Sequence, residues 1–226
     1  MADIKYDGRF TFARVQFTTG PGGYYYQGLP AWAHGYSRGE RHLTRILEFV
    51  SDLDVHTDGS KVLKVTDADL CKYPVAYITE VGYLNVTDEE VAALRAYLLK
   101  GGFLIVDDFR DDFQRGNSGF SNFTGVLSRV MPASKLVRLD GAHPIFHSFF
   151  DIDKPESFIP AYDRGGPPEF YGLYEDNNPS KRLQMIVNFN NDLSDYWEFS
   201  ERGYAVSNAN EAYKLGVNYI IYGLTH

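Results

Sequence analysis

The sequence has little cysteine and no long apolar run. Cys71 is the single cysteine among 226 residues, which excludes an internal disulfide and any metal site built from several cysteines. No apolar stretch approaches the ~20 residues that a membrane helix needs, so we expect no direct membrane insertion. Met1-Ala2-Asp3 leads into polar sequence and shows no signal peptide, although a signal that had been removed would leave the same start.

Positive charge is also scarce. The chain carries 22 Lys and Arg against 30 Asp and Glu, a formal charge of −8. Nucleic acids and anionic membranes bind clusters of basic side chains, so neither is expected as a partner. Hydrophobic residues make up 44% of the chain and charged residues 23%, the balance of a globular domain with a buried core. Because no repeat or linker interrupts it, we predict one domain over residues 1–226.

The signatures of common catalytic loops are absent. The sequence contains no Gly-x-Ser-x-Gly elbow, no His-Glu-x-x-His motif and no EF-hand loop. Gly20-Pro21-Gly22-Gly23 follows a predicted strand but opens no helix, so it lacks the context of a phosphate-binding loop. Cys71 precedes a predicted strand, which is the wrong end for catalysis. We interpret it as a small buried hydrophobic residue.

The chain does have alternating strand and helix patterns. Ser37 and Thr87 begin capping boxes, Asn208 is the expected cap of the last helix, and Gly216 within that helix suggests close packing on the sheet. Strands are predicted at about 10–17, 54–56, 62–65, 75–79, 103–106, 136–139, 170–174 and 183–189, and helices at about 37–50, 87–99, 120–130 and 208–224. The order implies right-handed crossovers and an α/β fold, a doubly wound and mostly parallel sheet with helices on both faces.

Irregular segments interrupt this pattern. An aromatic loop is predicted at about 18–36, and a loop-rich insertion at about 141–182. Long connections without secondary structure are uncommon and often functional, but this loop could equally fold its own aromatic rings over the sheet. An Asp58-Gly59 turn is expected between two short strands, and the polar segment 110–119 is predicted to be a mobile connection.

A strand that ends in two carboxylates, Asp107 and Asp108, locates the candidate site. Adjacent side chains on a strand point to opposite faces, so the two cannot aim the same way while the strand lasts. They lie at its carboxyl end, where open α/β sheets bind ligands. Glu80 ends another strand, and His143 precedes a proline. Carboxylates with a histidine can bind a divalent cation or act as an acid–base pair, so Asp107, Asp108, His143 and Glu80 are the candidate catalytic residues.

A second group of residues could bind a ligand. Aromatic rings offer stacking faces and Asp or Asn side chains bind hydroxyl groups, which suggests sugars. Arg14 and Arg38 are candidate partners of the carboxylates. The alternatives are rings that cover the sheet, and Asp or Asn side chains that cap helices or form turns. The candidate ligand-binding residues are Arg14, Trp32, Arg38, Tyr83, Asn190, Asn191 and Asp192.

Several motifs together resemble those of a bacterial family known as domain of unknown function 4159. They are Phe10-Thr-Phe-Ala-Arg, Gly101-Gly102-Phe-Leu-Ile-Val-Asp-Asp-Phe, His143-Pro-Ile-Phe, Gly166-Pro-Pro-Glu-Phe, Asn190-Asn191-Asp192 and the segment from Leu215 to His226. The resemblance covers about Phe10 to His226. It implies a class I glutamine-amidotransferase-like, flavodoxin-like fold, similar to trehalose-utilisation-type proteins. It also implies an extracytoplasmic location, because members are commonly exported or attached to membrane-anchored proteins.

The wider fold group often carries a cysteine nucleophile after the central strand. Here Asp107-Asp108-Phe109 stand at that place, so glutamine hydrolysis is not expected. Three functions stay open: a domain that binds a small polar, carbohydrate-like ligand; a hydrolase or isomerase assisted by a metal or by a carboxylate and histidine; and a structural module with a protein partner. No cofactor is assigned, and a divalent metal is left open.

Overall fold

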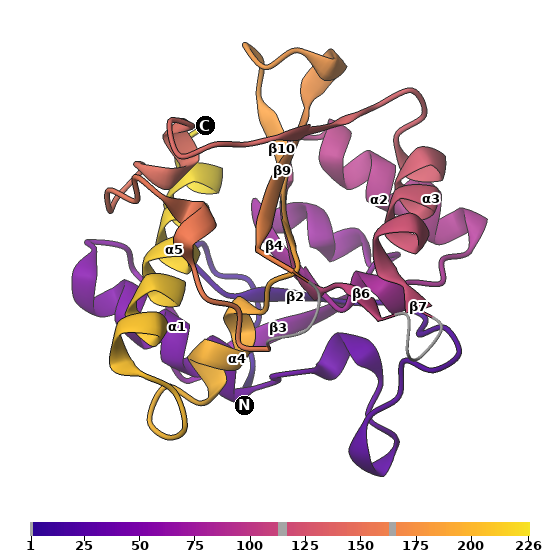
Figure 1. Ribbon diagram of the computed structural model, residues 1–226. Coiled ribbons are helices and arrows are strands. Elements are labelled where there is room, and N and C mark those ends of the chain that lie inside the picture. Colours follow the sequence, from indigo (N-terminus) through magenta and orange to yellow (C-terminus); the bar gives the residue numbers. More distant parts are fainter. Residues whose placement is uncertain (1, 113–116, 163–165) are drawn as a thin grey trace.

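A computed structural model describes residues 2–112, 117–162 and 166–226 of the chain (Figure 1). Residues 113–116, within the predicted mobile connection, and residues 163–165, within the predicted insertion, lie outside the described part. One eight-stranded sheet stands between two layers of helices, and the predicted α/β class with a mostly parallel sheet is confirmed. In the described part, no helix combines the length and apolar character needed to cross a membrane.

The sheet has the strand order β1-β3-β2-β4-β5-β10-β9-β8. All neighbouring pairs from β1 to β10 are parallel, whereas β9 runs antiparallel to both β10 and β8. Its strands are β1 (Ala2–Asp3), β2 (Ala13–Gln16), β3 (Gly59–Lys64), β4 (Val75–Thr79), β5 (Phe103–Phe109), β8 (Leu136–Arg138), β9 (Glu169–Tyr174) and β10 (Leu183–Phe189). Strands β6 (Asp111–Asp112) and β7 (Asn117–Ser118) form a separate pair.

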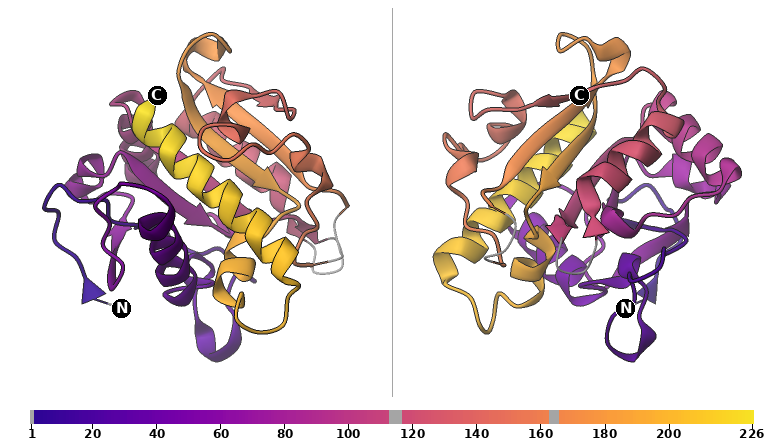
Figure 2. Two further views of the ribbon diagram at one scale, coloured as in Figure 1. Left: turned by 90° about the vertical axis from the view of Figure 1, so that its left-hand side faces the viewer. Right: turned by 45° about the vertical axis from the view of Figure 1, so that its right-hand side comes forward.

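In the described residues, five α-helices cover the two faces of the sheet. α1 (Arg38–Val50), α4 (Leu193–Glu198) and α5 (Val206–Thr225) lie on one face, and α2 (Asp88–Leu99) and α3 (Gly119–Val130) on the other (Figure 2). Side chains of β4 alternate between these layers. Tyr77 packs in the core on the side of α4 and α5, and Ile78 in the core on the side of α2 and α3. A strand with a core on each face has to be apolar throughout, which is why β4 reads as a continuous apolar run.

The capping predictions have different outcomes at three helices. At α2 the capping box is confirmed, because Thr87 Oγ1 accepts from Glu90 N at 3.2 Å and Glu90 Oε2 accepts from Thr87 N at 2.9 Å. At α1 Ser37 makes no such bond, and Glu40 turns into the protein to pair with Arg14. The cap predicted for the last helix is wrong by three residues, since α5 begins at Val206, just after Ala205. Tertiary contacts therefore decide how these two helices begin.

Other predictions are corrected by the parallel pairing of the first strands. Gly59 begins β3 instead of forming a turn, because β3 pairs in parallel with β1 and β2. Val55 makes only an isolated bridge to Phe10. Cys71 is exposed, not buried: it lies in the 3-10 helix Ala68–Lys72, in which Leu70 takes the inward position. The sequence patterns also did not predict α4.

Candidate functional site

The candidate site begins at an irregularity in β5. The register between β5 and β10 shifts at Asp107 and Asp108, which together lie opposite Asn188 and so form a β-bulge. Asp108 has φ 53°, in the left-handed region that residues other than glycine seldom adopt. The bulge puts both carboxylates on one face: Asp107 binds Tyr77 and Asp108 binds Thr79, two residues apart on β4. The prediction that they point to opposite faces is therefore wrong, because the bulge breaks the strand's alternation.

The neighbouring strands end in the same conformation. Glu80 follows β4 with φ 54°, and Asn190 follows β10 with φ 53°. The Glu80 amide lies 3.2 Å from the carbonyl oxygen of Asp107 and 3.0 Å from that of Asp108, and Asn190 N donates to Phe109 O at 3.0 Å. Three adjacent strand ends thus turn together and hold one another through backbone hydrogen bonds. Backbone strain of this kind is retained where the surrounding contacts over-determine it, and it concentrates at functional sites.

Asp107 ties the sheet to the helix that follows β10. Its Oδ2 accepts from the amides of Leu193 and Ser194, at 3.0 and 3.2 Å, and from the Tyr77 hydroxyl at 3.0 Å. These two amides belong to the first turn of α4, whose dipole favours a carboxylate there. Oδ1 of Asp107 is buried without a hydrogen-bond partner in the described part of the chain. Asp107 is therefore an anchor beneath the site.

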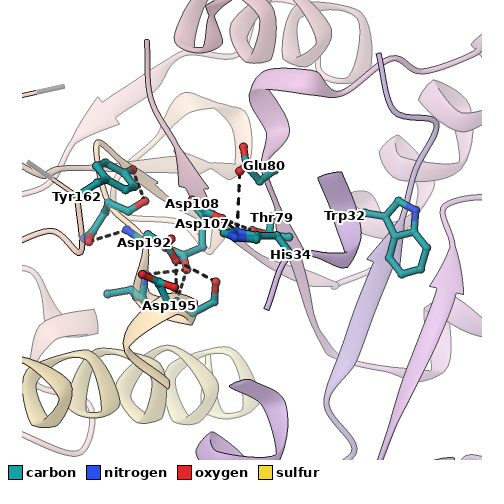
Figure 3. Close-up of polar contacts among 12 residues, drawn as sticks. Trp32, His34, Thr79, Glu80, Asp107, Asp108, Tyr162, Asp192 and Asp195 are labelled. Atoms are coloured by element: carbon teal, nitrogen blue, oxygen red, sulfur yellow. Dashed lines mark hydrogen bonds and ion pairs between the residues drawn. The ribbon is translucent and has the colours of Figure 1, made fainter. Parts of the chain in front are cut away.

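His34 brings the aromatic loop to these strand ends. Its Nδ1 lies 2.6 Å from Asp108 Oδ2 and 3.9 Å from Glu80 Oε1 (Figure 3). The ring stacks on Tyr25, with centroids 4.8 Å apart. Arg14, 1% exposed, fixes the loop by donating from Nη1 to the carbonyls of Trp32 and His34, both at 2.9 Å. Arg14, a candidate ligand-binding residue from the sequence, therefore positions the loop instead.

Residues of these strand ends and of the aromatic loop line a cavity of about 320 Å³ at the carboxyl edge of the sheet. Arg110 lies 3.9 Å above the ring of Tyr162, and the Tyr162 hydroxyl donates to Asn191 O at 2.7 Å. Asp192 caps α4 by accepting from Asp195 N at 2.8 Å. The lining residues are Tyr25, His34, Glu80, Gly82, Tyr83, Asp108, Phe109, Arg110, Tyr162, Asp192 and Asp195.

Burial and crowding of charge perturb the acids of this site. Burial, followed by the charge of Asp108, raises the pKa of Asp107 to about 7. The same two causes, in the same order, raise the pKa of Asp192 well above its usual range. Burial lowers the pKa of His34, but the charge of Asp108 and its hydrogen bond outweigh that effect, so the net shift is upward. The pocket therefore concentrates negative charge and holds a proton or cation readily.

Several of the predicted site residues meet in this pocket. Glu80, Tyr83, Asp108 and Asp192 line it, and Asp107 lies directly beneath. Asn190 and Asn191 are buried at its edge: Asn190 Nδ2 donates to Pro167 O at 3.3 Å, and Asn191 Oδ1 accepts from Asp192 N at 3.0 Å. The two amides therefore support the chain around the pocket.

Besides Arg14, three predicted residues are not brought to the pocket. His143 binds the Tyr174 hydroxyl at 2.8 Å, and Tyr174 pairs with Leu183 at the start of β10, roughly 20 Å from that strand's carboxyl end. The Trp32 ring points away from the cluster (Figure 3). Arg38 lies on the surface, 3.8 Å from Glu201. Of the three, only the Trp32 carbonyl takes part, through Arg14.

The lining residues that sequence reasoning missed include His34, Arg110, Tyr162 and Asp195. Their one common signal is position, because each lies in a loop or on the short helix that follows a carboxyl strand end. His34 and Tyr25 both lie in the aromatic loop, for which the sequence leaves two alternatives open: a functional loop, or a loop that folds its rings over the sheet. The spacing of residues could not pair His34 with a carboxylate 74 positions away.

A family model agrees with the earlier resemblance. The model described as Domain of unknown function (DUF4159) matches residues 11–224. A search of curated proteins gives no match.

Proposed function

We propose that this chain, which belongs to the DUF4159 family, binds a small, polar, hydroxyl-rich molecule in the pocket at the carboxyl edge of its sheet. The observation that carries the proposal is the meeting of His34, Glu80 and Asp108 with three tyrosine rings around one cavity. Carboxylates accept from ligand hydroxyls, and rings pack against the apolar faces of sugars and polyols. The carbohydrate-like class of ligand is thus favoured.

The strand order supports the fold group that we propose. Numbered along the chain, the five parallel strands β2, β3, β4, β5 and β10 lie in the order 2-1-3-4-5, as in flavodoxin-like sheets. Such sheets bind ligands outside the carboxyl ends of their strands. The proposed amidotransferase-like relation allows the residues at the place of that group's nucleophile to be compared. Asp107 and Asp108 occupy the bulge where that group often has its nucleophile, and Cys71 lies before β4, at the opposite edge.

Charge narrows the class of ligand. Four carboxylates line the pocket, those of Glu80, Asp108, Asp192 and Asp195, whereas Arg110 is the one arginine among the described lining residues. Arg110 is already engaged with the Tyr162 ring. A phosphate or a dicarboxylate would therefore meet repulsion, while a neutral or cationic ligand would not.

Calorimetry and thermal shift with a panel of sugars and polyols at millimolar concentration test this proposal. We expect at least one to bind with one-to-one stoichiometry, and Tyr25→Ala to weaken it about tenfold. Tyr24→Ala is the matched control, because Tyr24 is 59% exposed and does not line the pocket. No binding by any member of the panel, or equal loss in both variants, would contradict the proposal.

The pairing of His34 with Asp108 favours a second candidate, a hydrolase or isomerase acting in the same pocket. A histidine and a carboxylate at 2.6 Å can together move a proton. With chromogenic glycosides and esters as substrates, turnover should fall at least about 100-fold in Asp108→Asn. Turnover that survives this change unaltered would exclude the pair as its source.

A further inference from the structure

One face of the pocket collects three side chains that are good metal ligands. His34, Glu80 and Asp108 each offer a ligand atom, and these atoms all lie within 4.8 Å of one another. We propose that they bind one divalent transition-metal ion. The inference deepens the proposed function by naming a cofactor for the same pocket, and it can be tested without knowing the organic ligand.

The spacing of the ligand atoms suits a single ion. Two ligands that each lie ~2.1 Å from a metal are roughly 3.0–3.4 Å apart when adjacent, and roughly 4.2 Å apart when opposite. His34 Nδ1 lies 2.6 Å from Asp108 Oδ2 and 3.9 Å from Glu80 Oε1. The first pair has to open by less than an ångström, and the second is already in range. A metal ion would take the place of the proton between His34 and Asp108.

The three ligands are held in place by the contacts around them. Glu80 and Asp108 sit on adjacent left-handed turns joined by the Glu80 amide, which bonds the carbonyl of Asp108 at 3.0 Å. Thr79 Oγ1 donates to Asp108 Oδ2 at 3.3 Å, and Arg14 holds the His34 carbonyl at 2.9 Å. Partners of this kind orient the ligands of metal sites and raise their affinity. Little reorganisation is therefore needed on binding.

The donor set indicates the class of metal. Imidazole suits transition metals such as Zn²⁺ and Fe²⁺, carboxylates suit Mn²⁺ and Mg²⁺, and Ca²⁺ prefers oxygen alone. One nitrogen and two carboxylates therefore favour Mn²⁺ or Zn²⁺ over Ca²⁺ and Mg²⁺. Three protein ligands leave coordination positions open, as in catalytic metal sites. Hydroxyl groups of a ligand in the pocket, or a water molecule, would fill them.

The surroundings favour a cation in a second way. Asp192 and Asp195 line the same cavity as Glu80 and Asp108, and Arg110, the described arginine among them, lies against the Tyr162 ring. Asp107 adds a buried carboxylate directly beneath. These carboxylates attract a divalent ion to the pocket.

Titration calorimetry and electron paramagnetic resonance with Mn²⁺ alone test the inference on the whole chain. We expect one equivalent of Mn²⁺ to bind, with a nitrogen signal from imidazole in the pulsed spectrum. Separate His34→Gln and Glu80→Gln variants should each weaken binding at least about tenfold, and His34→Gln should remove the nitrogen signal. These side chains are 32% and 13% exposed, so the variants are expected to fold, which circular dichroism checks.

His147→Gln is the matched control. His147 Nδ1 lies 3.0 Å from Asp151 Oδ1 on the surface, a histidine–aspartate pair without a third ligand in the described part of the chain. Binding should be unchanged in this variant. No stoichiometric Mn²⁺ or Zn²⁺, or binding that persists in both His34→Gln and Glu80→Gln, would overturn the inference. Failure of the sugar panel would leave it intact, since these measurements contain no organic ligand.

Discussion

At the residue scale, Glu40 shows how a tertiary contact replaces the role that local sequence suggests. Glu40 has the position of a capping-box residue, yet it is 1% exposed and pairs with Arg14. Breaking a buried ion pair by removing one partner is strongly destabilising, which makes this pair a fixed support for the loop that carries His34. The position of His34 thus depends on residues that do not touch the pocket.

Thr79 provides a test of that support next to the proposed metal ligands. Thr79→Val removes the hydroxyl that bonds Asp108 Oδ2. We expect Mn²⁺ binding to weaken about 10-fold, since hydrogen bonds to metal ligands contribute 10–100-fold in affinity. Calorimetry measures it. Thr124→Val is the control, because the Thr124 hydroxyl donates to the carbonyls of Phe120 and Ser121 in its own helix. Equal affinities in the two variants would speak against an orienting role for Thr79.

His143, distant from the pocket, has a structural role that depends on pH. Burial lowers its pKa from the usual 6.5, and its Nδ1 accepts from Ile145 N at 3.2 Å. Below pH ~6.5 the unfolded chain binds this proton more readily than the folded chain, so stability falls as the pH falls. Denaturant titrations between pH 5 and 8 should show a shallower acid-side loss in His143→Gln.

The pKa of His147 shifts in the opposite direction from that of His143. The Gly141 carbonyl, followed by Asp151, raises the pKa of His147, so its contribution is present at low pH and is lost as the pH rises. His147→Gln should therefore make the acid-side loss steeper. A change in the same direction for both variants would refute the assignment of His143.

At the scale of elements, the short helix α4 depends on a carboxylate from the sheet. Six residues are too few for a helix to be stable by itself. Asp107 satisfies two amides of its first turn, and Asp192 caps it by accepting from Asp195 N. The contact between Asp107 on β5 and the amides that follow β10 therefore fixes where α4 begins.

Removing that anchor should cost stability. Asp107→Ala leaves two buried amides without an acceptor, and each such loss costs about 1–3 kcal/mol, so we expect about 2–6 kcal/mol in all. Asp107→Asn keeps an acceptor oxygen and should cost less. Equilibrium denaturation measures both. If the alanine variant were no less stable than the asparagine variant, the anchoring role would be wrong.

Helix α5 packs closely because of its glycines. A Cβ at Gly216 would lie 2.8 Å from Trp197 Cζ2 and 2.9 Å from Leu43 Cδ1. The sequence suggests that this glycine packs on the sheet, but it packs on α4 and α1. We expect Gly216→Ala to destabilise the protein by about 1–3 kcal/mol. Gly125→Ala in α3, where nothing lies within 4 Å, should be neutral or stabilising by up to about 1 kcal/mol. Thermal denaturation of both variants checks the contrast.

At the scale of the whole molecule, the pocket joins parts of the chain that only the sheet brings together. Residues of the loop after β2, the ends of β4 and β5 and the start of α4 all contribute to it. A cation bound there would link these segments. A ligand that binds the folded state and not the unfolded chain raises the free energy of unfolding.

Mn²⁺ should therefore stabilise the entire fold. At a free concentration 100 times its dissociation constant, the expected gain is about 2.7 kcal/mol. For a chain of this length that corresponds to a rise of roughly 5–10 °C in Tm. Differential scanning calorimetry with and without a chelator measures it. An equal gain in His34→Gln would mean that the ion binds elsewhere.

The sequence by itself determined the elements and their class. Thr87, the apolar run of β4 and the glycine pair before β5 act through local backbone preferences and through burial on two faces, which are written in consecutive residues. It also located the carboxyl strand ends of Glu80, Asp108 and Asp192 as the candidate site, because the crossover pattern implies a parallel sheet.

Only the tertiary structure decided which side chains meet there. The bulge at Asp107 and Asp108 arises from the pairing of β5 with β10, two strands separated by more than 70 residues of chain. His34 reaches Asp108 because Arg14 and Glu40 fix its loop, and His143 is excluded because β9 runs antiparallel and carries its partner Tyr174 to the other edge. Contacts between distant segments depend on strand order and register, which no local pattern specifies.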